Sequence, residues 1–188
     1  MGKSEILVKN LVWGTAVLFG GRFRLASKWS KIKDNKMSAR IYIRPFRADD
    51  MERIMEIERA SFGRGAYDRK LFAELSHTCG DLFLVAAAGG NICGYMITCM
   101  RGQKAGSGAE LVSVAVDPAS RGRGTASSLI KNTLRRLRLR KAVRFSLMVR
   151  ATNEAARRLY ERHGFRRVRK VARYYEDGED GVLMSKPL

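Results

Sequence analysis

The 188 residues are enough for one domain with a sizeable core, and a hydrophobic content of 45% excludes a largely disordered chain. No run reaches the roughly 18 apolar residues of a spanning helix, so no membrane span is expected. Lys and Arg number 37 against 18 Asp and Glu, and this formal charge of +19 favours an anionic partner such as a phosphorylated cofactor, a nucleoprotein or an acidic membrane surface. The alternative is a basic exterior that is merely solvated.

The N-terminal 36 residues differ from the rest: an apolar run, Leu11–Gly21, precedes a basic segment. This pattern fits the hydrophobic region of a signal peptide, an amphipathic membrane anchor, or an extension ahead of a translation start at Met37. The third interpretation is favoured, because a complete domain pattern begins directly afterwards. The expected organisation is an extension over residues 1–36 and one domain over residues 37–188.

From Ile41 the sequence alternates between strand and helix signals. The first half predicts a strand over 41–44, a helix that begins at 48, a loop over 61–67 and a second helix over 68–77. A hairpin over 82–100, with its turn at 89–91, follows. The second half predicts strands over 110–116, 143–149, 165–172 and 181–184, with helices over 126–137 and 153–163. Such alternation is typical of the α/β class, with a mixed central sheet flanked by helices.

The segment Val114–Ile130 joins a valine-rich strand to an amphipathic helix through the loop Arg121-Gly122-Arg123-Gly124. Glycines let the backbone approach a ligand closely, and a helix N-terminus offers unpaired N–H groups to a phosphate. The arginines add positive charge, and the small residues Thr125 and Ala126 keep the first turn open. The segment therefore predicts a pyrophosphate cradle; the alternative is a glycine-rich helix start with incidental arginines.

The stretch VDPASRGRGTA resembles the R/Q-x-x-G-x-G/A motif of the GNAT superfamily of N-acetyltransferases, and the resemblance extends over residues 41–188. It implies the GNAT acyl-CoA N-acyltransferase fold, acetyl-CoA as the co-substrate and no metal. The cofactor-binding residues that it implies are Val114, Val116, Arg121, Gly122, Arg123, Gly124, Thr125, Ala126, Asn153, Ala156 and Tyr160.

A second stretch, Val149–Val168, resembles the V-R-x-x-N-x-x-A-x-x-L-Y-x-x-x-G-F segment of ribosomal-protein alanine N-acetyltransferases and related N-terminal acetyltransferases. The tail Tyr174–Met184 resembles a strand-connecting loop of that group. These likenesses imply transfer of an acetyl group to a protein or peptide amine, above all an N-terminal α-amine. Direct attack in a ternary complex is expected, because no cysteine lies in the motifs.

Tyr160 matches the tyrosine of the L-Y pair, which implies that its phenol protonates or hydrogen-bonds the coenzyme A sulfur. Asn153 matches a residue that contacts the pantetheine arm, and it also suits a helix N-cap. Where the ribosomal-protein enzymes have a glutamate base, this chain has Met148, whose thioether cannot accept the amine proton. Glu110 resembles the glutamate base of histone lysine acetyltransferases and is predicted to replace it; the alternative is a surface charge.

By the same resemblance the acceptor lies between the loop 61–67 and the tyrosine pair of the tail, so the predicted substrate contacts are Phe62, Tyr67, Tyr174 and Tyr175. Glu179 and Asp180 are candidates to anchor a cationic substrate. Arginines crowd residues 135–141 and 157–169, which suits a ribosome or ribosomal-protein partner. Interleaved aromatic residues are missing, so sequence-specific reading of nucleic acid is not expected.

Cys79, Cys93 and Cys99 lack the spacing of a metal site, and their odd number predicts reduced thiols in a cytoplasmic protein. His77 and His163 have no ligand partner in the sequence. Two alternative functions stay open. One keeps the fold but takes a small amine or polyamine as acceptor, and the other is a non-catalytic acetyl-CoA-binding module that docks on a ribosome or RNA.

Overall fold

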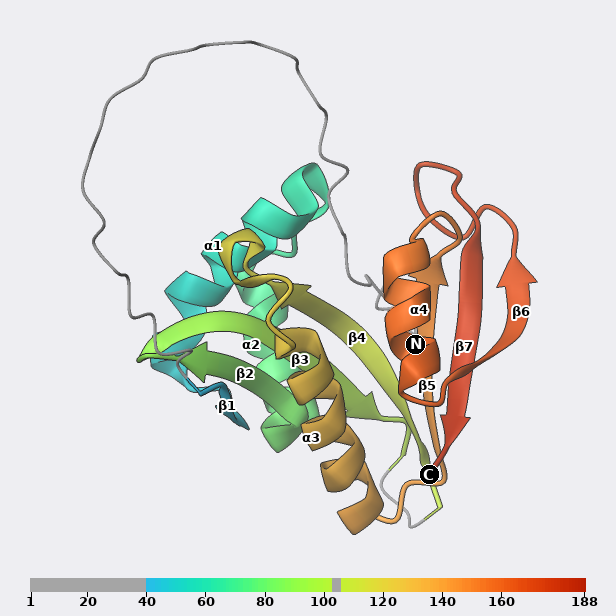
Figure 1. The fold of residues 1–188 in the computed structure, drawn as a ribbon, viewed down its shortest axis with the longest axis horizontal. Helices are drawn as coiled ribbons and strands as arrows, with labels where there is room; N and C mark the ends of the chain where they lie inside the picture. Colours follow the sequence, from blue (N-terminus) through green and yellow to red (C-terminus); the bar gives the residue numbers. More distant parts are fainter. Residues whose placement is uncertain (1–39, 103–105) are drawn as a thin grey trace, which may run out of the picture.

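The computed structural model describes residues 40–102 and 106–188, so the extension predicted over residues 1–36 lies outside the described residues. The described chain forms one seven-stranded sheet in the order β1-β2-β3-β4-β5-β7-β6 (Figure 1). Its strands are β1 Tyr42–Pro45, β2 Phe83–Ala88, β3 Asn91–Met100, β4 Gly108–Val116, β5 Arg144–Arg150, β6 Arg166–Val171 and β7 Gly181–Pro187. Its α-helices are α1 Met51–Phe62, α2 Arg69–Cys79, α3 Thr125–Leu139 and α4 Glu154–Arg162.

Local sequence signals explain where several elements begin and end. The Asp68 side chain caps α2 by accepting a hydrogen bond from the Leu71 amide at 2.8 Å, and Asn153 caps α4 in the same way through the Ala156 amide at 3.0 Å. Gly89 and Gly90 both have positive φ and close the β2–β3 hairpin, as their sequence predicts. The predicted α/β class is therefore confirmed, including the mixed sheet.

Several boundaries differ by a few residues from the sequence-based expectation, and two of these differences have a clear structural basis. The loop expected over residues 61–67 is partly helical, because α1 continues to Phe62 and a 3₁₀ turn follows over Gly63–Gly65. The last strand runs to Pro187 rather than Met184, because its final residues, Ser185 to Pro187, pair with Ser146, Phe145 and Arg144 of β5.

The sheet separates two hydrophobic cores, one on each face. Figure 1 shows the helices that cover the two faces. Helices α3 and α4 pack on the face that carries Leu111, Val114 and Val149. Helices α1 and α2 pack on the other face, over β2, β3 and β4. Because successive residues of a strand point to opposite faces, β2, β3 and β4 contribute side chains to both cores.

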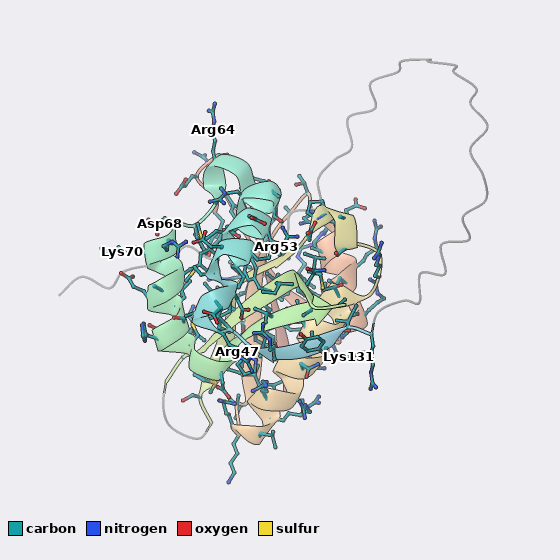
Figure 2. The ribbon with its side chains drawn as sticks, turned by 90° about the vertical axis from the view of Figure 1, so that its left-hand side faces the viewer. Arg47, Arg53, Arg64, Asp68, Lys70 and Lys131 are labelled. Atoms are coloured by element: carbon teal, nitrogen blue, oxygen red, sulfur yellow. A yellow bond between two sulfur atoms is a disulfide. The ribbon has the colours of Figure 1, made fainter. Side chains whose placement is uncertain are left out.

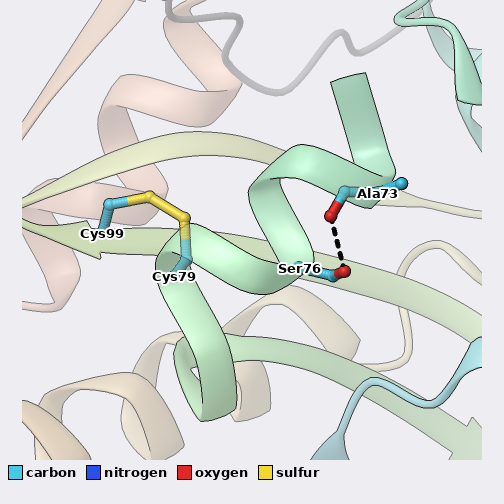
Figure 3. The surroundings of a disulfide bond; sticks show 4 residues. All are labelled: Ala73, Ser76, Cys79 and Cys99. Atoms are coloured by element: carbon cyan, nitrogen blue, oxygen red, sulfur yellow. Dashed lines mark hydrogen bonds between the residues drawn. A yellow bond between two sulfur atoms is a disulfide. The ribbon is translucent and has the colours of Figure 1, made fainter. Parts of the chain in front are cut away.

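The expectation of reduced thiols is wrong for two of the three cysteines. Cys79 at the end of α2 and Cys99 on β3 form a disulfide, with Cα atoms 4.6 Å apart (Figure 3). Their separation of 20 residues in the sequence gave no signal, because the pairing depends on how α2 crosses the sheet. Cys93 is free and buried, as expected of a small hydrophobic residue.

A buried carboxylate joins α1 to the sheet and to the following loop. Glu58 is fully buried and accepts hydrogen bonds from the Tyr67 amide at 2.9 Å and from the Tyr95 hydroxyl. The Tyr95 hydroxyl lies 3.0 Å from that of Ser113 on β4. Burial, followed by the charge of Glu58, raises the pKa of the Tyr95 phenol. The network thus ties α1, the loop before α2 and β4 together.

Replacing Glu58 with alanine is expected to lower the free energy of unfolding by about 3 kcal/mol, because two buried donors lose their acceptor. Urea denaturation measures this loss. The control is Glu56→Ala on the same helix, where the exposed side chain pairs with Arg53, and its expected cost is below about 0.5 kcal/mol. Equal effects of the two substitutions would contradict this account.

Candidate active site

Strands β4 and β5 lie side by side for only a short distance and then separate. Their parallel pairing covers Gly108 with Arg144, Ala109 with Phe145 and Glu110 with Ser146, and it stops there. Figure 1 shows the two strands diverging toward their C-terminal ends. Beyond Glu110, the edge of β4 that faces β5 therefore has no paired strand among the described residues. Its backbone donors and acceptors are available to an extended ligand.

A β-bulge lies at the point where the strands separate. Ile97 of β3 pairs with Ser113 and the next residue, Thr98, pairs with Leu111, so Val112 is the extra residue of β4. A bulge bends its strand and increases its twist, which helps to turn β4 away from β5. The sequence pattern ELVSVAV predicts the strand but gives no sign of the bulge.

The loop after β4 has the geometry of a phosphate cradle. Gly122 and Gly124 have φ of 75° and 80°, and a Cβ atom built on either would meet nothing within 4 Å, so their backbone is bare to solvent. Helix α3 begins at Thr125, and the N–H groups of its first turn have no carbonyl in a preceding turn. The bare loop and the helix N-terminus together suit a diphosphate.

Contacts with α1 and β3 hold this loop in place. The Asp117 side chain accepts from the Ala119 amide at 2.9 Å and also pairs with Arg53 of α1. The Asp117 amide donates to the Cys93 carbonyl at 2.9 Å, and Arg121 Nε donates to the Val116 carbonyl at 3.3 Å. The predicted cradle is thus fixed before a ligand arrives, which reduces the entropy that binding must overcome.

A pocket of about 260 Å³ lies between this loop and α4. The loop side carries six of the predicted cofactor residues, and α4 adds two residues that the sequence did not single out for this site. The lining residues are Val116, Ser120, Arg121, Gly122, Gly124, Thr125, Ala126, Ser127, Leu159 and Arg162. Among the other predicted contacts, Val114 and Ala156 are buried in the core beneath α3 and α4, and Arg123 is exposed on the loop.

Tyr160 lies on the side of α4 that faces the sheet, and only 1% of its surface is exposed. Its hydroxyl finds no hydrogen-bond partner in the described parts of the chain. Burial raises the pKa of the Tyr160 phenol far above its usual range, and the nearby Tyr175 adds to the rise. A buried hydroxyl without a partner is costly to keep, which favours a role toward a ligand.

Glu110 is the last residue of β4 that pairs with β5, where its partner is Ser146; on the other side it pairs with Cys99 of β3. Its neighbours Ala109 and Leu111 point into the α3 core, so its carboxylate lies on the opposite face, where it pairs with Arg101. Met148 lies two residues beyond Ser146, on the same face. The candidate base therefore lies on the α1–α2 face of the sheet, and Tyr160 lies on the α4 face.

The predicted acceptor walls lie on that α1–α2 face, but they are less exposed than expected. Tyr67 is 6% exposed and packs edge-on against Phe72, and Phe62 is partly buried against the same core. Tyr175 is 5% exposed, whereas Tyr174 is half-buried with its ring 5.1 Å from that of Tyr175. Of the four aromatic residues, Phe62 and Tyr174 thus keep most surface for a substrate.

The prediction that Glu179 and Asp180 anchor a cationic substrate is not supported, because both carboxylates bind within the chain. Glu179 accepts from Arg150 at 2.7 Å and from the Thr152 hydroxyl at 2.6 Å, and Asp180 pairs with Lys170 at 2.6 Å. Burial opposes ionisation of Glu179, but these hydrogen bonds outweigh it and lower the pKa of its carboxyl. The two residues fix the β6–β7 loop.

Arg150 is a residue of this site to which the sequence pattern assigned no role. Its guanidinium lies 4.1 Å from the centre of the Tyr175 ring and pairs with Asp177 and Glu179, each at 2.7 Å. It therefore holds the tyrosine loop against the end of β5. The arginine of the V-R-x-x-N segment was visible in the sequence, but its partners come from a distant loop.

Residues 40–102 and 106–188 contain no group of His, Cys, Asp and Glu side chains arranged to hold a metal ion. Within the same ranges, no helix is long and apolar enough to cross a membrane.

Comparison with known proteins identifies the family. Residues 51–165 match the model of the acetyltransferase (GNAT) family. An uncharacterised N-acetyltransferase of Methanocaldococcus jannaschii is 35% identical over 146 residues, which cover 77% of this chain and 90% of that protein. An N-alpha-acetyltransferase of Sulfolobus acidocaldarius is 30% identical over 165 residues, 83% of this chain and 98% of its own.

Among solved structures, the ribosomal-protein-S18-alanine N-acetyltransferase of Escherichia coli superposes with a TM-score of 0.69 at 27% identity, covering 79% of this chain and 94% of that one. The chain belongs to the GNAT acetyltransferase family. The cradle, the open edge of β4 and the pocket beside α4 have room and hydrogen-bonding groups for acetyl-CoA, the co-substrate expected from the sequence.

Tyr160→Phe is expected to lower kcat about 100-fold with little effect on the free energy of unfolding, because the hydroxyl has no partner to lose in the folded protein. Because the pKa of Tyr160 is raised, the wild-type rate should show no loss from phenol ionisation between pH 7 and about pH 10. Steady-state kinetics of both proteins over this pH range measure kcat, and urea denaturation of both measures the free energy of unfolding. A phenylalanine variant as active as the wild type would show that the Tyr160 hydroxyl has no role in catalysis.

Proposed function

We propose that this protein transfers the acetyl group of acetyl-CoA to the N-terminal α-amine of a protein or peptide. The observation that carries acetyl transfer is the separation of β4 from β5 beyond Glu110 and Ser146, next to a phosphate-binding loop. The preference for an α-amine is supported by the relatives, since the Sulfolobus protein and the Escherichia coli enzyme are both named for N-terminal acetylation.

The bound thioester supplies an activated acetyl group, and the residues of the chain supply binding and proton handling. Glu110 removes the proton from the attacking ammonium, directly or through a water, and leaves the neutral amine to attack the acetyl carbon. As the carbon–sulfur bond breaks, the Tyr160 hydroxyl donates a hydrogen bond to the departing thiolate. The second proton lost by the amine nitrogen passes to this sulfur, directly or through water, so that coenzyme A leaves as the thiol. The raised pKa of Tyr160 favours the hydrogen bond over complete proton transfer from its phenol.

Thiol release across three acceptor classes tests the proposal: peptides with free N-termini, N-blocked peptides that contain lysine, and polyamines. We expect turnover of the first class only, with mass spectrometry placing the acetyl group on the α-amine. Glu110→Gln should lower kcat about 100-fold, whereas Glu74→Gln, an exposed carboxylate on α2, should not. Turnover of polyamines alone would favour a small-molecule enzyme, and binding without any turnover would favour the non-catalytic module.

We further infer that the sheet edge docks on the ribosome, where new N-termini emerge. Strand β6 is one of the two edge strands of the sheet, and its residues Arg166 to Lys170 are all exposed. Within the described chain, Lys170 is the one basic residue of this group that forms an ion pair. We call these residues the basic edge. Arginines are well suited to pair with RNA phosphates, because their planar guanidinium donates two parallel hydrogen bonds.

Reversing three charges of the basic edge, as Arg166→Glu, Arg167→Glu and Arg169→Glu, should lower co-sedimentation with ribosomes at least about tenfold at 0.1 M salt. Acetylation of a free peptide should stay unchanged, since none of the three residues lines the site. The matched control reverses Arg59, Arg64 and Lys70 on the opposite side of the molecule, two of which are labelled in Figure 2. Equal loss of ribosome binding in both variants would show that binding depends on net charge alone, and it would contradict docking through β6.

A further inference from the structure

Four basic side chains from three elements gather where the end of α4 meets the start of α3. Lys131 comes from α3, Arg162 and His163 from the end of α4, and Lys186 from β7. Figure 2 shows Lys131 on the α3 side of the molecule, away from Lys70 on α2. These residues are distinct from the loop arginines, Arg121 and Arg123, to which the cradle was assigned.

Short contacts fix this group. His163 Nε2 lies 2.7 Å from the hydroxyl of Ser127, which is in the first turn of α3. A Cβ atom built on Gly164 would lie 2.5 Å from Lys186 Nζ, so the ammonium group packs directly on the backbone that ends α4. Burial lowers the pKa of the His163 imidazole, and the charges of Lys131, Arg162 and Lys186 lower it further. The positive charges of Lys131, Arg162 and Lys186 are therefore all close enough to affect the His163 imidazole.

These charges lack a neutralising carboxylate within residues 40–102 and 106–188. Lys131, Arg162 and Lys186 form no ion pair with any acidic residue in the part of the chain that the structure describes. Converging like charges raise the free energy of the folded state unless an anion is bound between them. The group also opens on the cofactor pocket, because Ser127 and Arg162 are both part of its lining.

Coenzyme A carries two separate phosphate groups, the diphosphate and a monoester on the ribose 3′ carbon. The bare glycines and the α3 N-terminus provide the cradle for the diphosphate. We propose that Arg162 and Lys131, with Lys186 behind them, form a second anion subsite that binds the 3′-phosphate. This subsite deepens the proposed function, because it belongs to the same cofactor pocket.

His163 acts in this proposal as a positioning residue rather than a ligand. Its hydrogen bond to Ser127 holds the end of α4 at a fixed distance from the start of α3. Because Arg162 and the loop with Ser127 both line the pocket, this contact also fixes how far apart these two walls lie. His163→Ala should therefore weaken binding of coenzyme A and of its 3′-dephospho form by the same factor, since it changes the spacing and removes no phosphate contact.

Calorimetric titration of the full-length protein with coenzyme A and with 3′-dephospho-coenzyme A tests the subsite. The wild type should bind coenzyme A about tenfold more tightly than the dephospho form, as expected for a charge-assisted contact to a phosphate. Arg162→Gln should bring this ratio close to one and leave the affinity for the dephospho form unchanged. Arg167→Gln on β6 removes the same charge outside the pocket and should keep the wild-type ratio.

Either of two results overturns the proposal. A wild type that binds both molecules equally has no 3′-phosphate subsite. An Arg162→Gln variant that weakens both equally places Arg162 on the diphosphate instead. Lys131→Gln provides a second test if the arginine variant melts at a lower temperature, and it should lower the ratio as well. No acceptor is needed, so a protein that fails to acetylate peptides but shows the ratio would refute the proposed function and keep the subsite.

Discussion

The end of backbone pairing between β4 and β5 is the constraint on which the rest of this structure depends. A parallel pair that stopped after three residues in the middle of a hydrophobic sheet would leave polar groups of the backbone unsatisfied. The fold tolerates the separation because both strands are held on their other sides, β4 by β3 and β5 by β7. The bulge at Val112 bends β4 away. The result is a site built from rigid strands and completed by a substrate.

The separation also divides the labour between the two faces of the sheet. The α3–α4 face holds the phosphate loop, the pocket and Tyr160, which bind the cofactor in the proposed function. The opposite face holds Glu110, Met148 and the tyrosine loop that Arg150 fixes, which face the acceptor in the same proposal. In this proposal the amine approaches from one face and meets a thioester that enters from the other. This arrangement agrees with direct attack in a ternary complex, in which no group of the chain carries the acetyl.

Local signals in the sequence were sufficient for the fold and for the geometry of the glycine loop before α3. Valine-rich strands, helix caps at Asp68 and Asn153, and the glycines of the cradle each act within a few residues, so their pattern predicts the geometry. The acceptor side depends on contacts between distant segments. The ion pairs of Glu179 and Asp180, the Arg101 partner of Glu110 and the Cys79–Cys99 bond arise from the way elements cross, which no local pattern encodes.

Amide hydrogen exchange resolved to single residues, with and without coenzyme A, tests the central claim most directly. If the open edge of β4 is the cofactor site, the β4 amides beyond Glu110 that point away from β3 exchange rapidly in the free protein. They become protected when coenzyme A binds, together with the first turn of α3, while Gly108 to Glu110 stay protected throughout. Protection confined to the Arg121–Gly124 loop, with no change along β4, would contradict the account.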